Sequence, residues 1–130
     1  MTLRADFARV AGSLVGRVVV VAGTDERLPT VVSTLAAAGA FVASVAPTRS
    51  DAAQADFRAD PADRAVWERV APHIEQRLGP VDAVVVDRQC AAVVRDVFLP
   101  DLRRRGHGGV HVVTADQDVA AIVRSVEDML

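Results

Sequence analysis

The chain has 130 residues, of which 51% are hydrophobic and 25% charged, enough for one compact domain with a single core. Its formal net charge of −2 provides no basic field of the kind that draws a protein to nucleic acid or to a membrane surface, so we expect neither partner. No apolar run approaches the roughly 20 residues of a membrane-spanning helix, and the N-terminus MTLRADFARV lacks the apolar core of a signal peptide, which predicts a cytoplasmic protein.

Several residue types that often carry chemistry are scarce. All 15 basic residues are arginine, so the chain has no lysine, and it has no tyrosine. These absences exclude Schiff-base lysines, P-loop lysines and any Tyr/Lys acid–base pair. Cys90 is the only cysteine, so a disulfide within the chain is impossible, and we expect a buried, unreactive thiol in a reducing compartment.

The N-terminal part predicts a helical arm, then a strand, then a helix. Residues 1–15 form the arm, with Thr2 as a suitable cap. Residues 17–22 are a continuous apolar run bounded by glycines, which is typical of a parallel strand covered on both faces. The helix that follows should have Pro29 in its first turn and end at Gly39. The apolar stripes are Leu3, Phe7, Val10 and Leu14 in the arm, and Leu28, Val31, Val32 and Leu35 in the helix.

The middle of the chain predicts two further strands, at residues 40–46 and about 56–59, joined by a polar loop. The next helix opens with D-P-A-D, in which Asp60 suits the N-cap and Pro61 the first helical position. Pro72 should kink that helix or sit at an irregular turn. Gly79-Pro80 should end the helix, and its predicted buried face is Val66, Trp67, Val70, Ile74 and Leu78.

The last third predicts a strand at residues 81–86, a helix at 90–105, a strand at 110–114 and a helix at 116–130 that Asp116 caps. Strands that alternate with helices imply right-handed crossovers and an open parallel sheet. The inward residues are Cys90, Val93, Val94, Val97, Phe98 and Leu102 in the first of these helices, and Val119, Ile122, Val123, Val126 and Leu130 in the second.

The order of these pieces resembles the short-chain dehydrogenase/reductase family, a group with a Rossmann fold. The stretch GRVVVVAG at residues 16–23 resembles the family's G-K/R-V-A-L-V-T-G opening. The other matching stretches are AAGAFV at 37–42, DPAD at 60–63, LGPVD at 78–82 and FLPDLR at 98–103. We therefore predict an α/β fold in which residues 1–130 form a single truncated, doubly wound Rossmann-like domain. It should have about five mostly parallel strands in the order 3-2-1-4-5, with helices on both faces.

The family's phosphate-binding loop, T-G-x-x-x-G-x-G, matches this chain badly. It falls on AGTDERLP, where Gly23 is kept but Arg27 and Pro29 replace the later glycines. Those side chains should obstruct the close approach of the backbone to a pyrophosphate. Asp25 and Glu26 place negative charge where a phosphate would sit and can satisfy the N–H groups of the helix internally. Dinucleotide binding in the family's usual pose should be lost.

The other cofactor positions implied by the resemblance are altered too. Ala46 stands where an acidic residue would hold the adenosine ribose, although Arg49 could meet a 2′-phosphate, and VDRQ replaces the N-N-A-G motif after the fourth strand. Asp60 keeps its place on the adenine side, but an N-cap explains it without a ligand. The cofactor-binding candidates are therefore Gly23, Thr24, Asp60 and Asp87, for NAD or NADP only if the altered cleft still binds them.

The family's catalytic serine, tyrosine and lysine have no counterparts here. If Ala120-Ala121-Ile122 matches the A-A-V that follows the Y-x-x-x-K signature, Ala115 stands at the tyrosine position and Val119 at the lysine position. Family members also have a segment between the fifth strand and the last helix, and further strands after it, which this chain lacks. We predict no reductase activity and assign no catalytic residue.

Other polar residues give weaker hypotheses. Asp87 and Arg88 should flank the switch point of the sheet beside Thr24 and Asp25, where a small polar ligand could bind, but a solvated salt bridge is the simpler interpretation. A phosphoacceptor role for Asp87 would need a lysine, which the chain does not contain. An enzyme of another class, built from Asp87, Arg88 and Thr114, would have no converging nucleophile and base.

Histidine and arginine clusters indicate no further site. His73, His107 and His111 do not predict a metal site, because such a site needs more converging ligands. Residues 103–105 are three arginines at the end of a helix, where positive charge complements the helix dipole.

We therefore favour a non-catalytic domain that acts through protein–protein contacts, as a homodimer or as the partner of an active relative. The resemblance implies contacts through helices 90–105 and 116–130, because the corresponding helices of the family pair with those of a neighbour in a four-helix arrangement. The alternative is a residual nucleotide or small-ligand binding protein that uses the switch-point cleft.

Overall fold

The computed structural model describes residues 14–130, which form one five-stranded parallel sheet. The strands are β1 (Val18–Ala22), β2 (Phe41–Ala46), β3 (Ala55–Arg58), β4 (Ala83–Val86) and β5 (Gly109–Val112). Their order is β3-β2-β1-β4-β5, which confirms the predicted order. The chain therefore moves outward from β1 to β3, crosses to β4 and moves outward again, so the switch point lies between β1 and β4.

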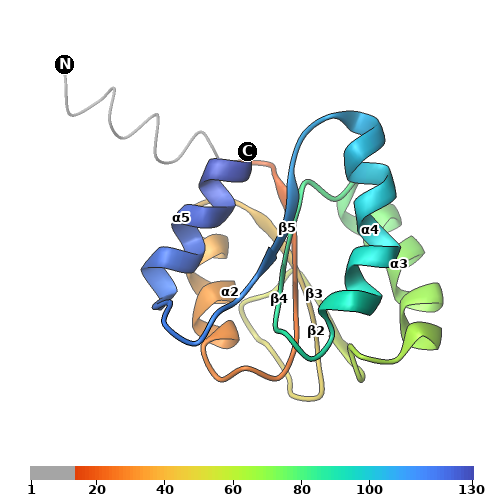
Figure 1. Ribbon diagram of the computed structural model, residues 1–130, viewed down its shortest axis with the longest axis horizontal. Coiled ribbons are helices and arrows are strands. Elements are labelled where there is room, and N and C mark those ends of the chain that lie inside the picture. The colour runs from red at the N-terminus through yellow and green to blue at the C-terminus, as the bar shows by residue number, and fades with distance from the viewer. Residues whose placement is uncertain (1–13) are drawn as a thin grey trace.

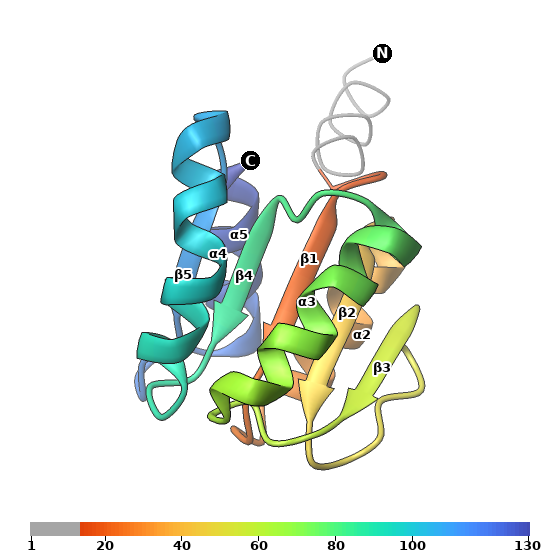
Figure 2. The same cartoon turned by 90° about the vertical axis from the view of Figure 1, so that its right-hand side faces the viewer.

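Within residues 14–130, four helices cover both faces of this sheet (Figure 1): α2 (Leu28–Ala37), α3 (Arg64–Leu78), α4 (Ala91–Arg105) and α5 (Val119–Met129). α2 and α5 lie on one face, and α3 and α4 lie on the other (Figure 2). Because the central strands β1 and β4 are covered on both sides, every residue of VVVVA and AVVV is buried, as the continuous apolar runs predicted.

The predicted helical stripes agree closely with the observed cores. α2 buries Leu28, Val31, Val32 and Leu35, and α3 buries all of its predicted residues except Leu78, which is partly buried. The α3 helix continues across the exposed Pro72. Trp67 of α3 packs edge-on against Phe98 of α4, with ring centroids 5.4 Å apart, and its Nε1–H donates to the carbonyl of Pro61 at 2.7 Å. The core between α3, α4 and the sheet therefore has one fixed aromatic pair.

Two predicted helix caps are wrong. Asp63, not Asp60, caps α3 by accepting a hydrogen bond from the N–H of Ala65 at 2.9 Å. Asp118, not Asp116, caps α5 by accepting from the N–H of Ala121 at 2.8 Å. In each case a second aspartate follows the first closely, and the second one has the extended backbone of an N-cap. Asp60 instead accepts the N–H of Ala62 at 2.9 Å, in the turn before α3.

The predicted arm lies outside the described residues except at its end, where residues 14–16 form a turn. Leu14 is fully buried against the α2 and α5 face, whereas Val15 is 60% exposed. Among residues 14–130, no helix combines the length and the apolarity that a membrane crossing requires.

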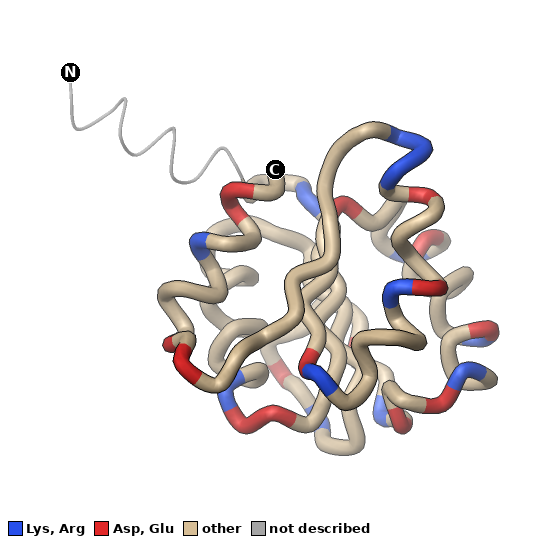
Figure 3. The backbone as a smooth tube through the Cα atoms, in the orientation of Figure 1, with Lys and Arg blue, Asp and Glu red and all other residues tan. Residues whose placement is uncertain are grey.

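The sheet separates α4 from α5, the two helices expected to pair with a neighbour. Val94 and Phe98 of α4 belong to the core on one face, and Ile122 and Val126 of α5 belong to the core on the other. The two helices therefore do not lie side by side (Figure 1), as two helices of a four-helix arrangement would. Charges of both signs are spread over the helix surfaces, with a basic stretch at the end of α4 (Figure 3).

Candidate functional site

The loop after β1 approaches Asp87, which follows β4. Gly23 has a φ of +141°, a backbone conformation that favours glycine. A Cβ atom at this position would lie 2.4 Å from Oδ2 of Asp87 and 3.0 Å from Cδ1 of Leu28. The structure therefore requires a glycine here so that the loop can close on a side chain of the same protein.

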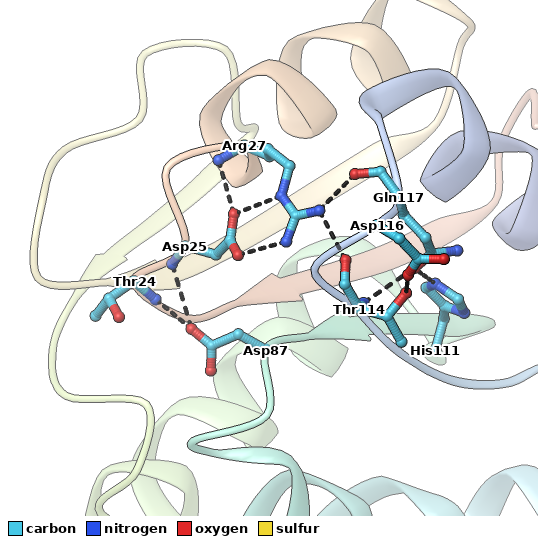
Figure 4. Close-up of polar contacts among 8 residues, drawn as sticks. All are labelled: Thr24, Asp25, Arg27, Asp87, His111, Thr114, Asp116 and Gln117. Carbon is cyan, nitrogen blue, oxygen red and sulfur yellow. Dashed lines mark hydrogen bonds and ion pairs between the residues drawn. The ribbon is translucent and has the colours of Figure 1, made fainter.

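Asp87 occupies the backbone donors of that loop (Figure 4). Its Oδ2 accepts the N–H of Thr24 at 2.7 Å and that of Asp25 at 3.3 Å, and the residue is only 8% exposed. The predicted solvated salt bridge with Arg88 is therefore wrong, because no ion pair joins the two among residues 14–130 and Asp87 is buried against the loop backbone. A buried carboxylate needs such donors, and the turn at Gly23 supplies them.

Cys90 lies beneath Asp87 and is 1% exposed. Its S–H donates to Oδ1 of Asp87 at 3.1 Å. Burial, followed by the bond and the negative charge of Asp87, raises the pKa of the thiol to about 12. Because the thiolate is the reactive form, Cys90 is a neutral packing residue at pH 7, in agreement with the predicted buried, unreactive thiol.

Arg27 joins two loops that are distant in sequence (Figure 4). Its Nε and Nη2 donate to the two carboxylate oxygens of Asp25 at 2.9 and 2.7 Å. Its Nη1 donates to the carbonyl of Thr114 at 2.8 Å and also to that of Gln117. The guanidinium therefore connects the loop between β1 and α2 to the loop between β5 and α5, at the end of the sheet where the switch point lies. The sequence predicted that Arg27 obstructs this region but not that it connects these loops.

The Arg27–Asp25 pair has clear electrostatic consequences. The hydrogen bonds from Arg27 hold the pKa of Asp25 below its usual value, and Asp25 raises the pKa of Arg27. Asp25 also accepts the backbone N–H of Arg27 at 2.9 Å. This bond confirms that the acidic turn satisfies a donor at the start of α2 from within the chain.

The loop between β5 and α5 is held by its own side chains. Thr114 donates its hydroxyl to Asp116 at 2.7 Å, which lowers the pKa of Asp116. Gln117 Oε1 accepts the N–H of Thr114 at 3.1 Å and the Nε2–H of His111 at 2.9 Å. Within residues 14–130, no hydrogen bond links Thr114 to Asp87 or Arg88, so the structure does not assemble these residues into a catalytic group.

Two cavities of about 230 Å³ lie on either side of these contacts. One lies between the loop after β1 and the end of β2, and its lining includes Ser44, Thr48, Arg49 and Ser50. The other lies beside Arg27, and its lining includes Asp87, Arg88, Gln89 and Ala115. Pockets that bury drug-sized ligands usually measure about 300–1,000 Å³, so neither cavity alone is large enough for a dinucleotide.

The four predicted cofactor residues lie close together. Asp60 shares a small cavity of about 30 Å³ with Thr24 and Asp87, and Gly23 lies in the turn beside them. Arg49, the predicted contact for a 2′-phosphate, lines the cavity between the loop after β1 and the end of β2. Its side chain is exposed and pairs with Asp51 at 2.7 Å. The expected residues therefore lie together, but the carboxylate of Asp87 accepts backbone N–H groups of the same chain.

The three histidines have separate partners. His73 donates Nδ1–H to the carbonyl of Arg69 at 2.8 Å, and His107 lies 3.2 Å from a carboxylate oxygen of Asp82. In the part of the chain that the structure describes, no three His, Cys, Asp or Glu side chains come together as metal ligands. Arg104 and Arg105 both pair with Asp101, and Arg105 also donates to the carbonyl of Val81, so the basic stretch of α4 is partly neutralised.

Comparisons with known proteins identify the fold. No protein-family model matches the sequence, and no curated protein matches it. A short-chain dehydrogenase from Leptospira borgpetersenii with bound NAD+ superposes with a TM-score of 0.69 at 9% identity, over 91% of this chain and 63% of that one. The NADH-dependent reductase A1-R′, complexed with NAD, gives a TM-score of 0.66 at 14% identity, over 91% of this chain and 69% of that one.

A short-chain dehydrogenase/reductase from Serratia marcescens gives a TM-score of 0.57 at 20% identity, over 89% of this chain and 68% of that one. Identities this low show the fold alone. The chain therefore has the Rossmann-like fold of short-chain dehydrogenases/reductases and matches about two thirds of the length of these solved structures.

Proposed function

We propose that this protein is a non-catalytic domain with the short-chain dehydrogenase/reductase fold and that it acts through contacts with other proteins. One observation carries the proposal: the carboxylate of Asp87 accepts the N–H groups of Thr24 and Asp25. In Rossmann-like folds, the donors at the end of the first strand and the start of the first helix hold the phosphates of the cofactor.

These residues do not fit a dinucleotide phosphate. A phosphate at this loop would have to displace Asp87 from two backbone donors and would lie beside the carboxylates of Asp87 and Asp25. It would also meet Arg27, whose guanidinium donors already bond Asp25 and two carbonyls. Repulsion between like charges and the cost of leaving Asp87 buried without donors both oppose binding.

The residues available for chemistry support the same conclusion. Ala115 and Val119 stand where the resemblance places a tyrosine and a lysine, and no tyrosine or lysine occurs anywhere in the sequence. Neither side chain can donate a proton to a carbonyl substrate. The one thiol is protonated and buried, so it does not supply a nucleophile.

Isothermal titration of the protein with NAD, NADH, NADP and NADPH tests the proposal. We expect no binding with a Kd below about 1 mM. Asp87→Asn is the matched variant for this titration. It keeps a carbonyl oxygen in place of Oδ2 but removes the negative charge, so it shows how far that charge alone opposes dinucleotide binding. Binding of any of the four dinucleotides by the wild-type protein with a micromolar Kd would contradict the claim that the loop after β1 does not accept a dinucleotide phosphate.

Light scattering over a range of protein concentrations tests the part of the proposal that concerns contacts with other proteins. A homodimer should double the measured mass as the concentration rises. A strict monomer at high concentration, together with the absence of any co-purifying protein, would contradict that part. Because α4 and α5 lie on opposite faces of the sheet, a dimer should not depend on both helices at once.

The alternative function is the binding of a small ligand in the cavity beside β2. Its lining offers the hydroxyls of Ser44, Thr48 and Ser50, and its volume of about 230 Å³ suits a fragment such as a ribose rather than a dinucleotide. A thermal-shift screen with nucleosides, nucleotides, flavins and acyl-CoA tests it. A ligand at this site should stabilise the wild-type protein more than Ser44→Ala, and a flat screen rejects the alternative.

A further inference from the structure

A larger concave surface is lined by residues of β3 and α3. Figure 2 shows β3 at one edge of the sheet. The volume of this concave surface is about 570 Å³, more than twice that of either cavity near the switch point. We call it the β3–α3 groove. Residues 56–59 supply one wall, and Arg69, Val70 and His73 of α3 supply the other.

The β3 wall of the groove is an open strand edge. β3 is the last strand in the sheet order, and its pairing with β2 leaves the opposite edge unpaired among the described strands. Ala59 donates its N–H to the carbonyl of Ala46 on β2 at 3.0 Å. Alternate residues of a parallel strand bond the same neighbour, so Asp56 and Arg58 direct their backbone N–H and C=O groups to the open edge. Such an edge is a template for an added strand.

The groove combines this edge with an apolar floor and positive charge. Val70 is 8% exposed, and Phe57 is partly buried against the same core. Arg58 and Arg69 are exposed, and neither forms an ion pair within residues 14–130.

Other arginines, such as Arg88 and Arg124, are also exposed and form no ion pair within residues 14–130. Arg58 and Arg69 differ in this respect from Arg27, Arg49, Arg64, Arg104 and Arg105, which each pair with an aspartate. His73 donates Nδ1–H to the carbonyl of Arg69, so its Nε2 is the ring nitrogen that could contact a ligand. Among the described residues that line the groove, Arg58 and Arg69 are basic and Asp56 alone is acidic.

We propose that the β3–α3 groove binds an extended acidic segment of another protein, which adds a strand to the open edge of β3. The main chain of the segment pairs with the backbone of Asp56 and Arg58, and apolar side chains on one side of it contact Phe57 and Val70. Its carboxylates lie on the opposite side and pair with Arg58, because successive side chains of β3 point to opposite faces of the sheet. Arg69, beside Val70, adds positive charge on the α3 side. A groove between a strand edge and a helix is a known way of recognising an extended peptide. This inference rests on the proposed function, because it names the surface and the partner for the protein contacts.

Charge and shape favour a peptide over a single-stranded nucleic acid. A nucleic acid offers phosphates to the arginines but no N–H and C=O ladder to the strand edge. The formal net charge of −2 also opposes a polyanion as long as a nucleic acid. A short acidic peptide meets the local positive charge and the strand edge together.

Fluorescence anisotropy with labelled nine-residue peptides tests the proposal on the full-length protein. The probe alternates valine with glutamate, and a second probe replaces every glutamate with lysine. We expect the acidic probe to bind with a Kd of about 10–100 µM, more weakly as salt rises, and the basic probe to bind at least about tenfold more weakly. A third probe, methylated on alternate amide nitrogens, should lose binding because it cannot complete the ladder.

Variants of the groove separate charge from strand pairing. Arg58→Glu should weaken binding of the acidic probe about tenfold, and Arg69→Glu should weaken it by a smaller factor, whereas Arg124→Glu, on the exposed side of α5, should leave it unchanged. Arg58→Pro should weaken it more than Arg58→Gln, because both remove the charge but only proline removes the outward N–H. Proline is tolerated on an edge strand, so circular dichroism should show both variants folded.

Four outcomes would overturn the proposal: no binding of the acidic probe, equal binding of the lysine probe, full binding of the methylated probe, or charge-reversal variants that behave like Arg124→Glu. Oligouridine that binds in an Arg58- and Arg69-dependent way, while the acidic probe does not, would assign the groove to nucleic acid and also overturn it. If the protein binds a dinucleotide with a micromolar Kd and also binds the acidic probe, the groove proposal stands. Only the claim that the switch-point loops exclude a dinucleotide is then wrong.

Discussion

The switch-point loops and the β3–α3 groove are two concave regions at the margins of one sheet, and they differ in how their polar groups are paired. At the switch point, Asp87 holds two backbone donors and Arg27 bonds Asp25 and two carbonyls. In the groove, Arg58 and Arg69 have no acidic partner among residues 14–130, and the β3 edge has no neighbouring strand there.

This difference determines which of the two regions can gain bonds from a ligand. A region whose donors and acceptors are satisfied from within gains little from a ligand, because every new bond replaces an existing one. A region whose charges and backbone groups are bonded only to water exchanges those water bonds for bonds to a ligand and keeps every bond within the protein. In this protein, the fold's usual cofactor position belongs to the first kind, and an ordinary sheet edge belongs to the second.

The largest expected effect comes from filling the space between the loop and Asp87. Gly23→Ala places a Cβ atom 2.4 Å from Oδ2 of Asp87, at a φ of +141°. The loop or Asp87 must shift, which breaks the bond to Thr24, and we expect a loss of about 3 kcal/mol in the free energy of unfolding. Urea denaturation measures it. A loss below about 1 kcal/mol would show that the loop does not need this close approach.

Asp87→Ala should destabilise the protein by about 2 kcal/mol, because it leaves the N–H groups of Thr24 and Asp25 without their acceptor. Asp87→Asn keeps an oxygen acceptor and should cost less. The double variant tests the contact between the two positions, since the cost of Gly23→Ala should fall in the Asp87→Ala background, where the clashing carboxylate atoms are gone. Additive costs would contradict direct contact between the two positions.

Arg27→Met should lower the urea midpoint by less than Asp87→Ala, because Arg27 is only partly buried and water can replace some of its bonds. The methionine keeps most of the side-chain length while removing every donor. Hydrogen exchange should become faster in the loop between β5 and α5, which Arg27 holds through the carbonyls of Thr114 and Gln117. Arg124→Met on α5 is the control, and equal exchange in the two variants would show that Arg27 does not restrain the loop.

The smallest effect concerns pH. Arg27 holds the pKa of Asp25 below its ordinary value of 3.8, so Asp25 binds protons less readily in the folded than in the unfolded chain. The stabilisation from the pair is present above that value and is lost as the pH falls through the lower, folded pKa. Asp25→Asn should therefore reduce the free energy of unfolding at about pH 6 and make less difference at about pH 2. A difference that grows on acidification would contradict the assigned pair.

Periodicity predicted most of the fold. The buried stripes of α2 and α3 and the continuous valine runs of β1 and β4 follow from local spacing, and the order of the strands follows from the resemblance. The caps at Asp60 and Asp116 were wrong because each has a second aspartate close behind, and only backbone geometry selects between two neighbouring acceptors.

The site could be predicted only in part. Gly23, Thr24 and Asp87 were expected at the switch point, and an aspartate directly after a buried strand, facing a glycine turn, could have indicated the internal bond. The reach of Arg27 to Thr114 and Gln117 could not be predicted, because no periodic pattern relates a side chain in one loop to carbonyls in a loop near the other end of the chain.

The central place of β1 has a consequence for how the protein is made. Among the described strands, β1 leaves the ribosome first, yet its neighbour on one side, β4, follows only after β2, β3 and α3, with Val19 paired to Ala83. Until β4 is synthesised, one edge of a strand of four valines has no partner, and such apolar, β-prone segments aggregate readily. The same feature that places the switch point at the centre of the sheet therefore leaves one edge of β1 unpaired until β4 has been synthesised.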